Sequence, residues 1–288
     1  SVLVIILVTR TYGAEGSLPI YQYSQSVYML PYAVLAVPIA TAMFPRLSSL
    51  LHQGGTAAFN PECAASTRLV TIVGLFGSAL LVTLARPVTD IFTRINPVPG
   101  MLWALVAMAP GIVGYGLVYH VSRVLYALGG ARQAVVASSA GWLTVAGLSW
   151  GLGAVLPEMV SNRANGILLA LGLAQSVGMT LGAVGLIIGL RQLAGRPAVS
   201  GLGVAALKAF LLALLAAAAG WWVSGFFMGL WPGVVGTFVA AAIAALISAL
   251  IMSPLLIPQL RKQKRDRAAG KDSTDSLGGD NSEKQSGQ

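Results

Sequence analysis

Long apolar runs separated by short polar connections are the feature that most constrains this chain. The segment Trp231–Pro258 contains no charged residue, and it exceeds the roughly 20 apolar residues that cross a bilayer as a helix. Charged residues make up only 9% of the chain, against about 25% in soluble domains. A transmembrane β-barrel would instead alternate polar and apolar residues. We therefore predict an all-α polytopic membrane protein.

Seven apolar runs predict about seven full transmembrane helices, at 19–45, 68–85, 100–128, 133–156, 165–190, 204–227 and 231–258. Residues 1–10 are too short to cross and are interpreted as the end of a truncated helix whose upstream part is missing. Polar connections are expected at 46–67, with room for a short interfacial helix, and at 86–99. The predicted domains are a lobe at 19–190, two additional helices at 204–258, and a disordered tail at 259–288.

Basic residues predict the orientation, because Lys and Arg favour the cytoplasmic side of short loops. The tail opens with a basic run from Arg261 to Arg267, so we place the C-terminus in the cytoplasm. Counting back through the spans puts seven basic residues on the same side: Arg46, Arg68, Arg123, Arg132, Arg191, Arg196 and Lys208. The net charge of +9 is thus an orientation signal and does not predict nucleic-acid binding.

The sequence carries no enzyme motif. It has neither the phosphate-binding G-x-x-x-x-G-K pattern nor G-x-S-x-G, and its two histidines, His52 and His120, lack metal spacing. We read both histidines as structural. The single cysteine, Cys63, excludes an intrachain disulfide. We predict no enzyme activity, no cofactor and no metal site.

The span Pro19–Pro45 contains polar residues and four prolines. Polar side chains inside a membrane are expensive and usually functional, so Tyr23, Gln25 and Ser26 are candidates for lining a hydrophilic cavity. The alternative is hydrogen bonding between helices together with an aromatic belt. Prolines are tolerated where neighbouring helices or a cavity satisfy the freed carbonyls. We expect Pro31 and Pro38 to bend this helix and to serve as hinges.

Two further patterns leave alternatives open. Arg123 lies about two-thirds along its span, where it either extends to the interface or meets an anionic ligand or an internal partner. Glycines recur four residues apart, which predicts close helix packing and smooth faces that slide in a transporter. These pairs are Gly147 with Gly151, Gly178 with Gly182, Gly185 with Gly189, and Gly225 with Gly229.

Two stretches resemble the MurJ (MviN) lipid II flippase family of the MOP superfamily. The eighth helix of that family ends in a T-x-L-F-P-x-L-S pattern, and TAMFPRLSS matches it at Thr41, Phe44, Pro45, Leu47 and Ser48. The run RVLYALGGARQAV resembles the end of the tenth helix at Arg123, Tyr126, Ala127, Leu128, Arg132 and Val135. It departs from the family at Gly130, Ala131, Gln133 and Ala134, which replace Asp, Thr, Thr and Pro. Where many members carry a cavity arginine in the eighth helix, this chain has Ser26.

The resemblance implies the C-terminal half of a lipid II flippase. Such a protein moves an undecaprenyl-pyrophosphoryl disaccharide-peptide from the inner to the outer leaflet of the bacterial plasma membrane by alternating access. The substrate contacts would be Tyr23, Gln25, Ser26 and Arg123, and the last two spans would form a groove for the lipid tail. Expected partners are the lipid-linked peptidoglycan precursor, membrane lipids and cell-wall synthesis proteins, with no nucleic acid.

Three other functions remain open at this point. A MOP-type exporter of another lipid-linked oligosaccharide or of a drug has the same physical character. A non-transporting scaffold for cell-wall enzymes is compatible with the tail, but it would not need polar residues inside the membrane. A membrane enzyme acting on polyprenyl lipids is disfavoured, because no acidic or histidine cluster lies near a membrane face.

Overall fold

Long helices form this protein, whose computed structural model describes residues 2–160 and 162–258. The chain divides into two units, Ser1–Met252 and Ser253–Gln288, and the packing described below belongs to the first. Six helices have the length and apolarity of a membrane span: Ser17–Gln53, Gly55–Thr93, Ala131–Met159, Arg163–Ala194, Arg196–Leu230 and Val234–Pro258. A bent pair, Met101–Met108 and Gly111–Ala127, makes a seventh. The prediction of an all-α polytopic membrane protein is confirmed.

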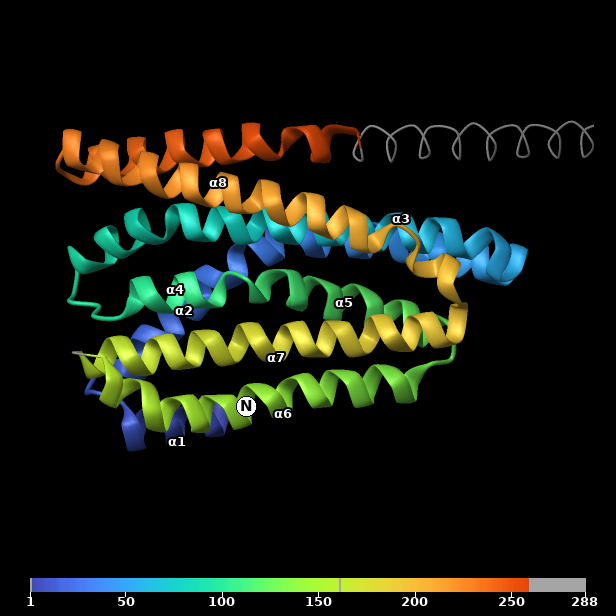
Figure 1. The fold of residues 1–288 in the computed structure, drawn as a ribbon, viewed down its shortest axis with the longest axis horizontal. Helices are drawn as coiled ribbons and strands as arrows, with labels where there is room; N and C mark the ends of the chain where they lie inside the picture. Colours follow the sequence, from blue (N-terminus) through green and yellow to red (C-terminus); the bar gives the residue numbers. More distant parts are fainter. Residues whose placement is uncertain (1, 161, 259–288) are drawn as a thin grey trace, which may run out of the picture. The chain divides into compact units, whose positions relative to one another are not determined.

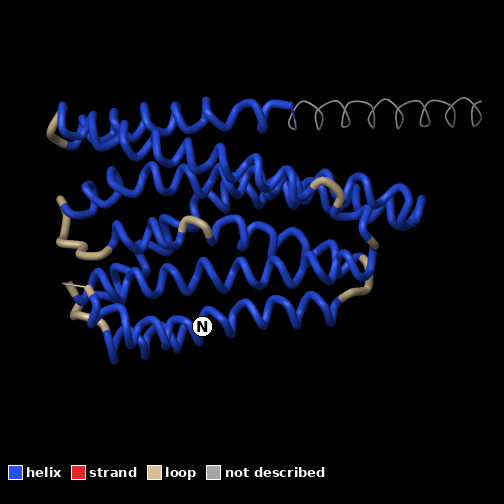
Figure 2. Tube along the Cα trace, viewed as in Figure 1, coloured by secondary structure: helices blue, strands red, loops and turns tan. Residues whose placement is uncertain are grey.

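Helices follow one another along the chain, and Figure 2 shows only helices and short loops among the described residues. The elements are α1 (Val2–Tyr12), α2 (Ser17–Pro31), the π-helical turn η1 (Tyr32–Ala36), α3 (Val37–Thr93), α4 (Met101–Met108), α5 (Gly111–Ala127), α6 (Ala131–Met159), α7 (Arg163–Ala194), the 3-10 turn η2 (Arg196–Val199) and α8 (Leu202–Leu230). A last helix, Val234–Pro258, follows. The connections fall alternately at the two ends of the helices (Figure 1). Residues 259–288, expected to be a disordered tail, lie outside the described part.

The polar connection expected at 46–67 is wrong, because helix occupies nearly all of it. The chain reverses sharply at Gly55, whose φ of 60° and ψ of −159° interrupt the helical backbone of α3. An ion pair joins the two arms, with Arg46 Nε 3.3 Å from Glu62 Oε1. At 37 and 39 residues, both arms are longer than the ~20 residues that cross a bilayer. Both arms are therefore long enough to extend beyond the hydrocarbon core.

Two other predicted boundaries also differ from the structure. The connection expected at 86–99 is helical as far as Thr93, and α3 continues through Pro87. The span expected at 100–128 is broken between α4 and α5 and bent by 47°. Pro110 explains the break, since it has no N–H to donate and its ring clashes with the preceding turn.

Helix α7 packs along α4, α5 and α6, and α3 packs along α5 and α8. Glycines bring α6 and α7 together, because a Cβ added at Gly141 would lie 3.0 Å from the Gly178 carbonyl oxygen and 3.1 Å from Gly182 Cα. The predicted pair Gly178/Gly182 thus lies at a helix contact. The pair Gly147/Gly151 does not, because a Cβ at either position would meet nothing within 4 Å.

Candidate functional site

The helix made of α2, η1 and the first arm of α3 carries most of the residues predicted to line a cavity. Tyr23 and Ser26 lie on its exposed side, and Gln25 is partly buried. The Ser26 hydroxyl donates to the Gln22 carbonyl of its own helix at 3.0 Å, and the Tyr23 ring lies 5.7 Å from that of Phe92. None of these contacts fills the exposed face, so the polar groups of α2 remain accessible.

The π-helical turn η1 begins directly after Pro31. Proline cannot donate a backbone hydrogen bond to the preceding turn, and a π turn is a common result where the ladder of helical bonds is disturbed. The ring of Pro31 fits against Gly77 of α3, where an added Cβ would lie 3.2 Å from Pro31 Cβ. Pro38 is exposed and lies in the first turn of α3, just after η1. The two predicted hinge prolines therefore flank this π-helical turn, which is called the wide turn below.

Aromatic rings hold the wide turn against α5. Tyr32 of η1 lies edge-on to Tyr115 at 4.7 Å between ring centroids and to Tyr119 at 5.8 Å. Tyr115 in turn meets Trp142 of α6 at 6.3 Å. Edge-to-face pairs at these separations are favourable beyond the area that they bury. The sequence analysis missed this stack, although Tyr28/Tyr32 and Tyr115/Tyr119 each recur at a spacing of four, which puts each pair on one helix face.

Arg123 ends this stack. Its guanidinium carbon lies 3.9 Å from the centroid of the Tyr119 ring, and Nη2 donates to the Tyr119 hydroxyl. Among the described residues it makes no ion pair. A guanidinium has five donors, so most of them stay available to an anion. Tyr119 thus links Arg123 to Tyr32. Tyr32 in turn lies about 9 Å from Ser26 along the axis of their shared helix.

A serine from α7 enters the break between α4 and α5, marked by the short loop in Figure 2. Ser176 Oγ accepts from the Gly111 N–H at 3.0 Å and donates to the Ala107 carbonyl. The hydroxyl thus replaces the backbone bond that a straight helix would make between these two groups. The Tyr28 hydroxyl lies beside this break, 3.2 Å from the position that a Cβ at Gly111 would take. The run Ala109-Pro110-Gly111 was the signal in the sequence for this break.

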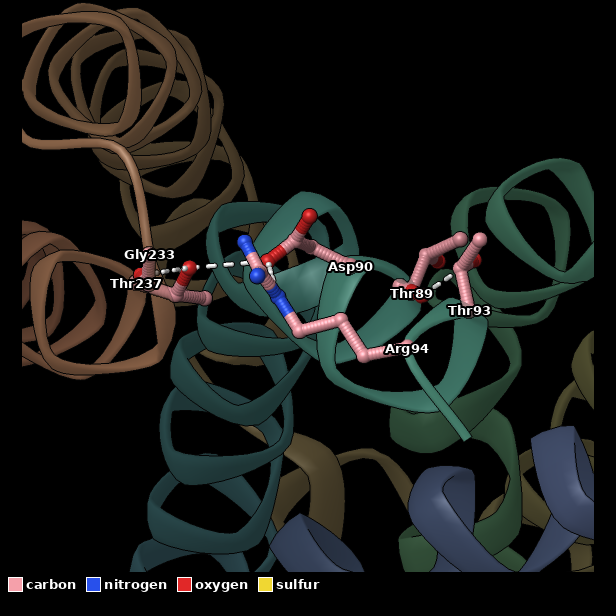
Figure 3. A network of polar contacts seen from close by, with 6 residues as sticks. All are labelled: Thr89, Asp90, Thr93, Arg94, Gly233 and Thr237. Carbon is pink, nitrogen blue, oxygen red and sulfur yellow. Dashed lines mark hydrogen bonds and ion pairs between the residues drawn. The ribbon is translucent and has the colours of Figure 1, made fainter. Parts of the chain in front are cut away.

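Polar contacts attach the last helix, Val234–Pro258, to α3. At one end, Asp90 Oδ2 accepts from Thr237 Oγ1 and from Arg94 Nε, both at 2.8 Å (Figure 3). Inside the span, Thr83 Oγ1 and Ser248 Oγ form a buried hydrogen bond of 3.0 Å. Hydrogen bonds between helices are a main source of association where lipid offers no hydrophobic gain. The last helix is therefore fixed to α3 in register.

His120 is buried, and its Nε2 lies 3.1 Å from Ser66 Oγ. This contact joins α5 to α3 inside the protein. No group of three or more His, Cys, Asp or Glu side chains with metal-binding geometry occurs in residues 2–160 and 162–258.

These features define a multi-pass α-helical membrane protein whose spans are bent at prolines and joined by buried polar contacts. The family model of the lipid II flippase MurJ matches residues 2–244, and the chain belongs to this family. It is also similar to a solved structure described as lipid II flippase MurJ in an inward closed conformation, at 18% identity and a TM-score of 0.65. That match covers 89% of this chain and 50% of the other, so the chain spans about half the length of the solved flippase. A search of curated proteins finds no match.

Proposed function

We propose that this chain takes part in flipping a lipid-linked peptidoglycan precursor, lipid II, from the inner to the outer leaflet of the bacterial plasma membrane. The observation that carries the proposal is the family match over residues 2–244. The C-terminus lies in the cytoplasm on the basic-residue rule. Cell-wall synthesis proteins are further candidate partners.

The proposed substrate contacts are Tyr23, Gln25, Ser26 and Arg123. The exposed polar face of α2 suits a hydrated sugar–peptide head group, and Arg123 has donors available for a diphosphate. Pro31, Pro38 and the wide turn between them are the proposed hinge of alternating access. The expectation that the last two helices hold the lipid tail stays a prediction.

The proposal is tested in the host by depleting the protein that contains this chain and measuring how much lipid-linked precursor becomes accessible at the outer face. Depletion should collapse this amount and raise the inner pool. Re-expression should restore it, whereas Arg123→Ala should restore only about a tenth, as expected for the loss of one charge-assisted contact. Arg191→Ala, at an exposed arginine in the last turn of α7, serves as the control and should rescue fully.

Other outcomes of this experiment favour other functions. Normal outer-face accessibility after depletion, in a strain without a second flippase, would exclude lipid II as the cargo and favour an exporter of another lipid-linked oligosaccharide. Full rescue by a variant with Tyr23, Gln25 and Ser26 all changed to alanine would favour a non-transporting scaffold.

The double variant Pro31→Ala, Pro38→Ala should slow transport several-fold. Alanine restores an N–H at both positions, which favours a regular α-helix in place of the wide turn η1. The measurement is labelling of a cysteine introduced at the exposed Ser26, in cells, alongside transport. Pro45→Ala, on the same helix but beyond the wide turn, should leave both unchanged. Unaltered transport and labelling in the double variant would exclude these prolines as hinges.

A further inference from the structure

An apolar cavity of about 820 Å³ lies between α8 and helices α3, α4, α5 and α7. Its wall on α3 runs from Thr71 to Val82, and its wall on α8 runs from Leu202 to Ala217. Nearly all of the lining side chains are aliphatic or aromatic, so the cavity suits hydrocarbon chains and disfavours a polar ligand.

One arginine of α3 lies just beyond each end of the cavity. Arg68 lies one turn before Thr71, and its Nη1 donates to the Ser200 carbonyl just ahead of α8. Arg86 lies one turn after Val82, and its guanidinium carbon is 3.9 Å from the centroid of the Trp221 ring. Trp221 itself follows Ala217 by one turn of α8. Each arginine thus joins α3 to α8 where the apolar wall ends.

The spacing of the two arginines matches the thickness of a membrane. The 18 residues from Arg68 to Arg86 rise about 27 Å along a helix, close to the ~30 Å of the hydrocarbon core. Two guanidinium groups at this separation can therefore lie at the two levels at which hydrocarbon gives way to head groups. Long arginine stems allow the charged ends to reach outward to that level.

Both guanidinium groups have unused donor capacity. Neither arginine makes an ion pair within the described part of the chain. Asp90, one turn from Arg86 on α3, accepts from Arg94 and Thr237 instead. A guanidinium presents five donors. Arg68 donates to one carbonyl, and Arg86 donates to one carbonyl and stacks on one ring. Cations without a carboxylate partner at these depths are candidates for binding anions.

We propose that the cavity between α3 and α8 binds an anionic glycerophospholipid from each leaflet, with the phosphates on Arg68 and Arg86 and one acyl chain of each lipid in the cavity. Guanidinium groups bind phosphate through paired, charge-assisted hydrogen bonds. A cation at both ends fits one lipid per leaflet, whereas a single diphosphate lipid would use only one of them. This inference does not depend on the proposed function, since it concerns lipids of the surrounding bilayer.

The test is native mass spectrometry of the purified full-length protein with added phosphatidylglycerol. The wild type should retain two phosphatidylglycerol molecules and should not retain diacylglycerol with the same chains. Arg68→Gln and Arg86→Gln should each weaken the retention of one lipid by about tenfold, and the double variant should retain neither. Arg163→Gln is the matched control, because Arg163 is exposed and pairs with Glu158, and it should bind as the wild type does.

Two further arms keep the proposal open to refutation. Arg68→Lys and Arg86→Lys preserve the charge and should retain phosphatidylglycerol; if they lose it as completely as the glutamine variants, packing rather than phosphate binding is responsible. Undecaprenyl phosphate is the second probe. Its retention in preference to phosphatidylglycerol would assign the cavity to a polyprenyl lipid and overturn the proposal, as would equal binding by the wild type and the double glutamine variant.

Discussion

Ser176→Ala should destabilise the protein by about 2 kcal/mol, above the ~0.6 kcal/mol average for hydrogen bonds between membrane helices. One substitution removes two bonds, because Ser176 Oγ accepts from the Gly111 N–H and donates to the Ala107 carbonyl. Each group left unpaired in the interior costs about 1–3 kcal/mol. A direct bond between Gly111 and Ala107 would recover part of this loss, but it would require α4 and α5 to straighten from their 47° bend.

This effect is measured as a free energy of unfolding in mixed micelles, together with hydrogen exchange of the Gly111 amide. Exchange at Gly111 should accelerate in the variant. Ser122→Ala is the control, since the Ser122 hydroxyl donates only to the Val118 carbonyl of its own helix; its effect should stay below about 0.5 kcal/mol. Equal destabilisation by the two variants, or unchanged exchange at Gly111, would show that Ser176 does not support the break.

Gly114→Ala should destabilise the protein by about 3 kcal/mol, the upper end of the usual range for overpacking. The added Cβ would lie 2.5 Å from Met179 C, 2.6 Å from Met179 O and 2.7 Å from Thr180 N. All three are backbone atoms, so no change of rotamer relieves the clash. Helices α5 and α7 must therefore separate where they cross.

Gly147→Ala provides the comparison for this variant. A Cβ at Gly147 meets nothing within 4 Å, and alanine is a better helix former than glycine by up to about 1 kcal/mol. The thermal midpoint should fall for Gly114→Ala and stay equal or rise for Gly147→Ala. If the two variants shift the midpoint alike, close packing at Gly114 is not what holds α5 against α7.

Hydropathy was enough to predict the number and order of the spans, but it does not predict where a helix ends. The reason is visible at residues 46–67, where a polar sequence is helical on both sides of Gly55. Hydropathy reports which residues face lipid, whereas helix formation needs only backbone hydrogen bonds and allowed dihedral angles. The end of an apolar run coincides with the end of a helix only where the helix stops at the membrane surface.

Glycine spacing identifies a face of a helix but not the neighbour of that face. Gly147/Gly151 and Gly178/Gly182 look identical in sequence, yet only the second pair lies against another helix. Gly114 has no glycine or alanine four residues away, since its neighbours at that spacing are Pro110 and Val118. A Cβ at Gly114 would nevertheless lie closer to the backbone of a neighbouring helix than a Cβ at Gly178 would. These differences depend on tertiary packing, which a single sequence does not contain.

The proposed site was chosen from the sequence by its chemistry, and its residues stay predictions. Proline and polar residues inside an apolar run are enough to single out Pro31, Gln25 and Ser26. Nothing local points to Ser176, because its two partners lie in a break more than 60 residues earlier in the chain. The stack around Tyr32 likewise joins three helices and becomes visible only once they are packed.

The wide turn at η1 also sets the rotational phase of everything that follows it on the same helix. Buried residues recur at intervals of four from Ser24 through Tyr28, Tyr32 and Ala36 to Ala40. A regular α-helix turns about 100° per residue, so a repeat of four would carry this buried strip steadily around the axis and away from the protein. The π-helical turn η1 has more residues per turn than an α-helix, so each of its residues rotates the chain by a smaller angle. This smaller rotation compensates for part of the drift of the buried strip. Removing a single residue there would turn the whole arm up to Gln53 onto a different face.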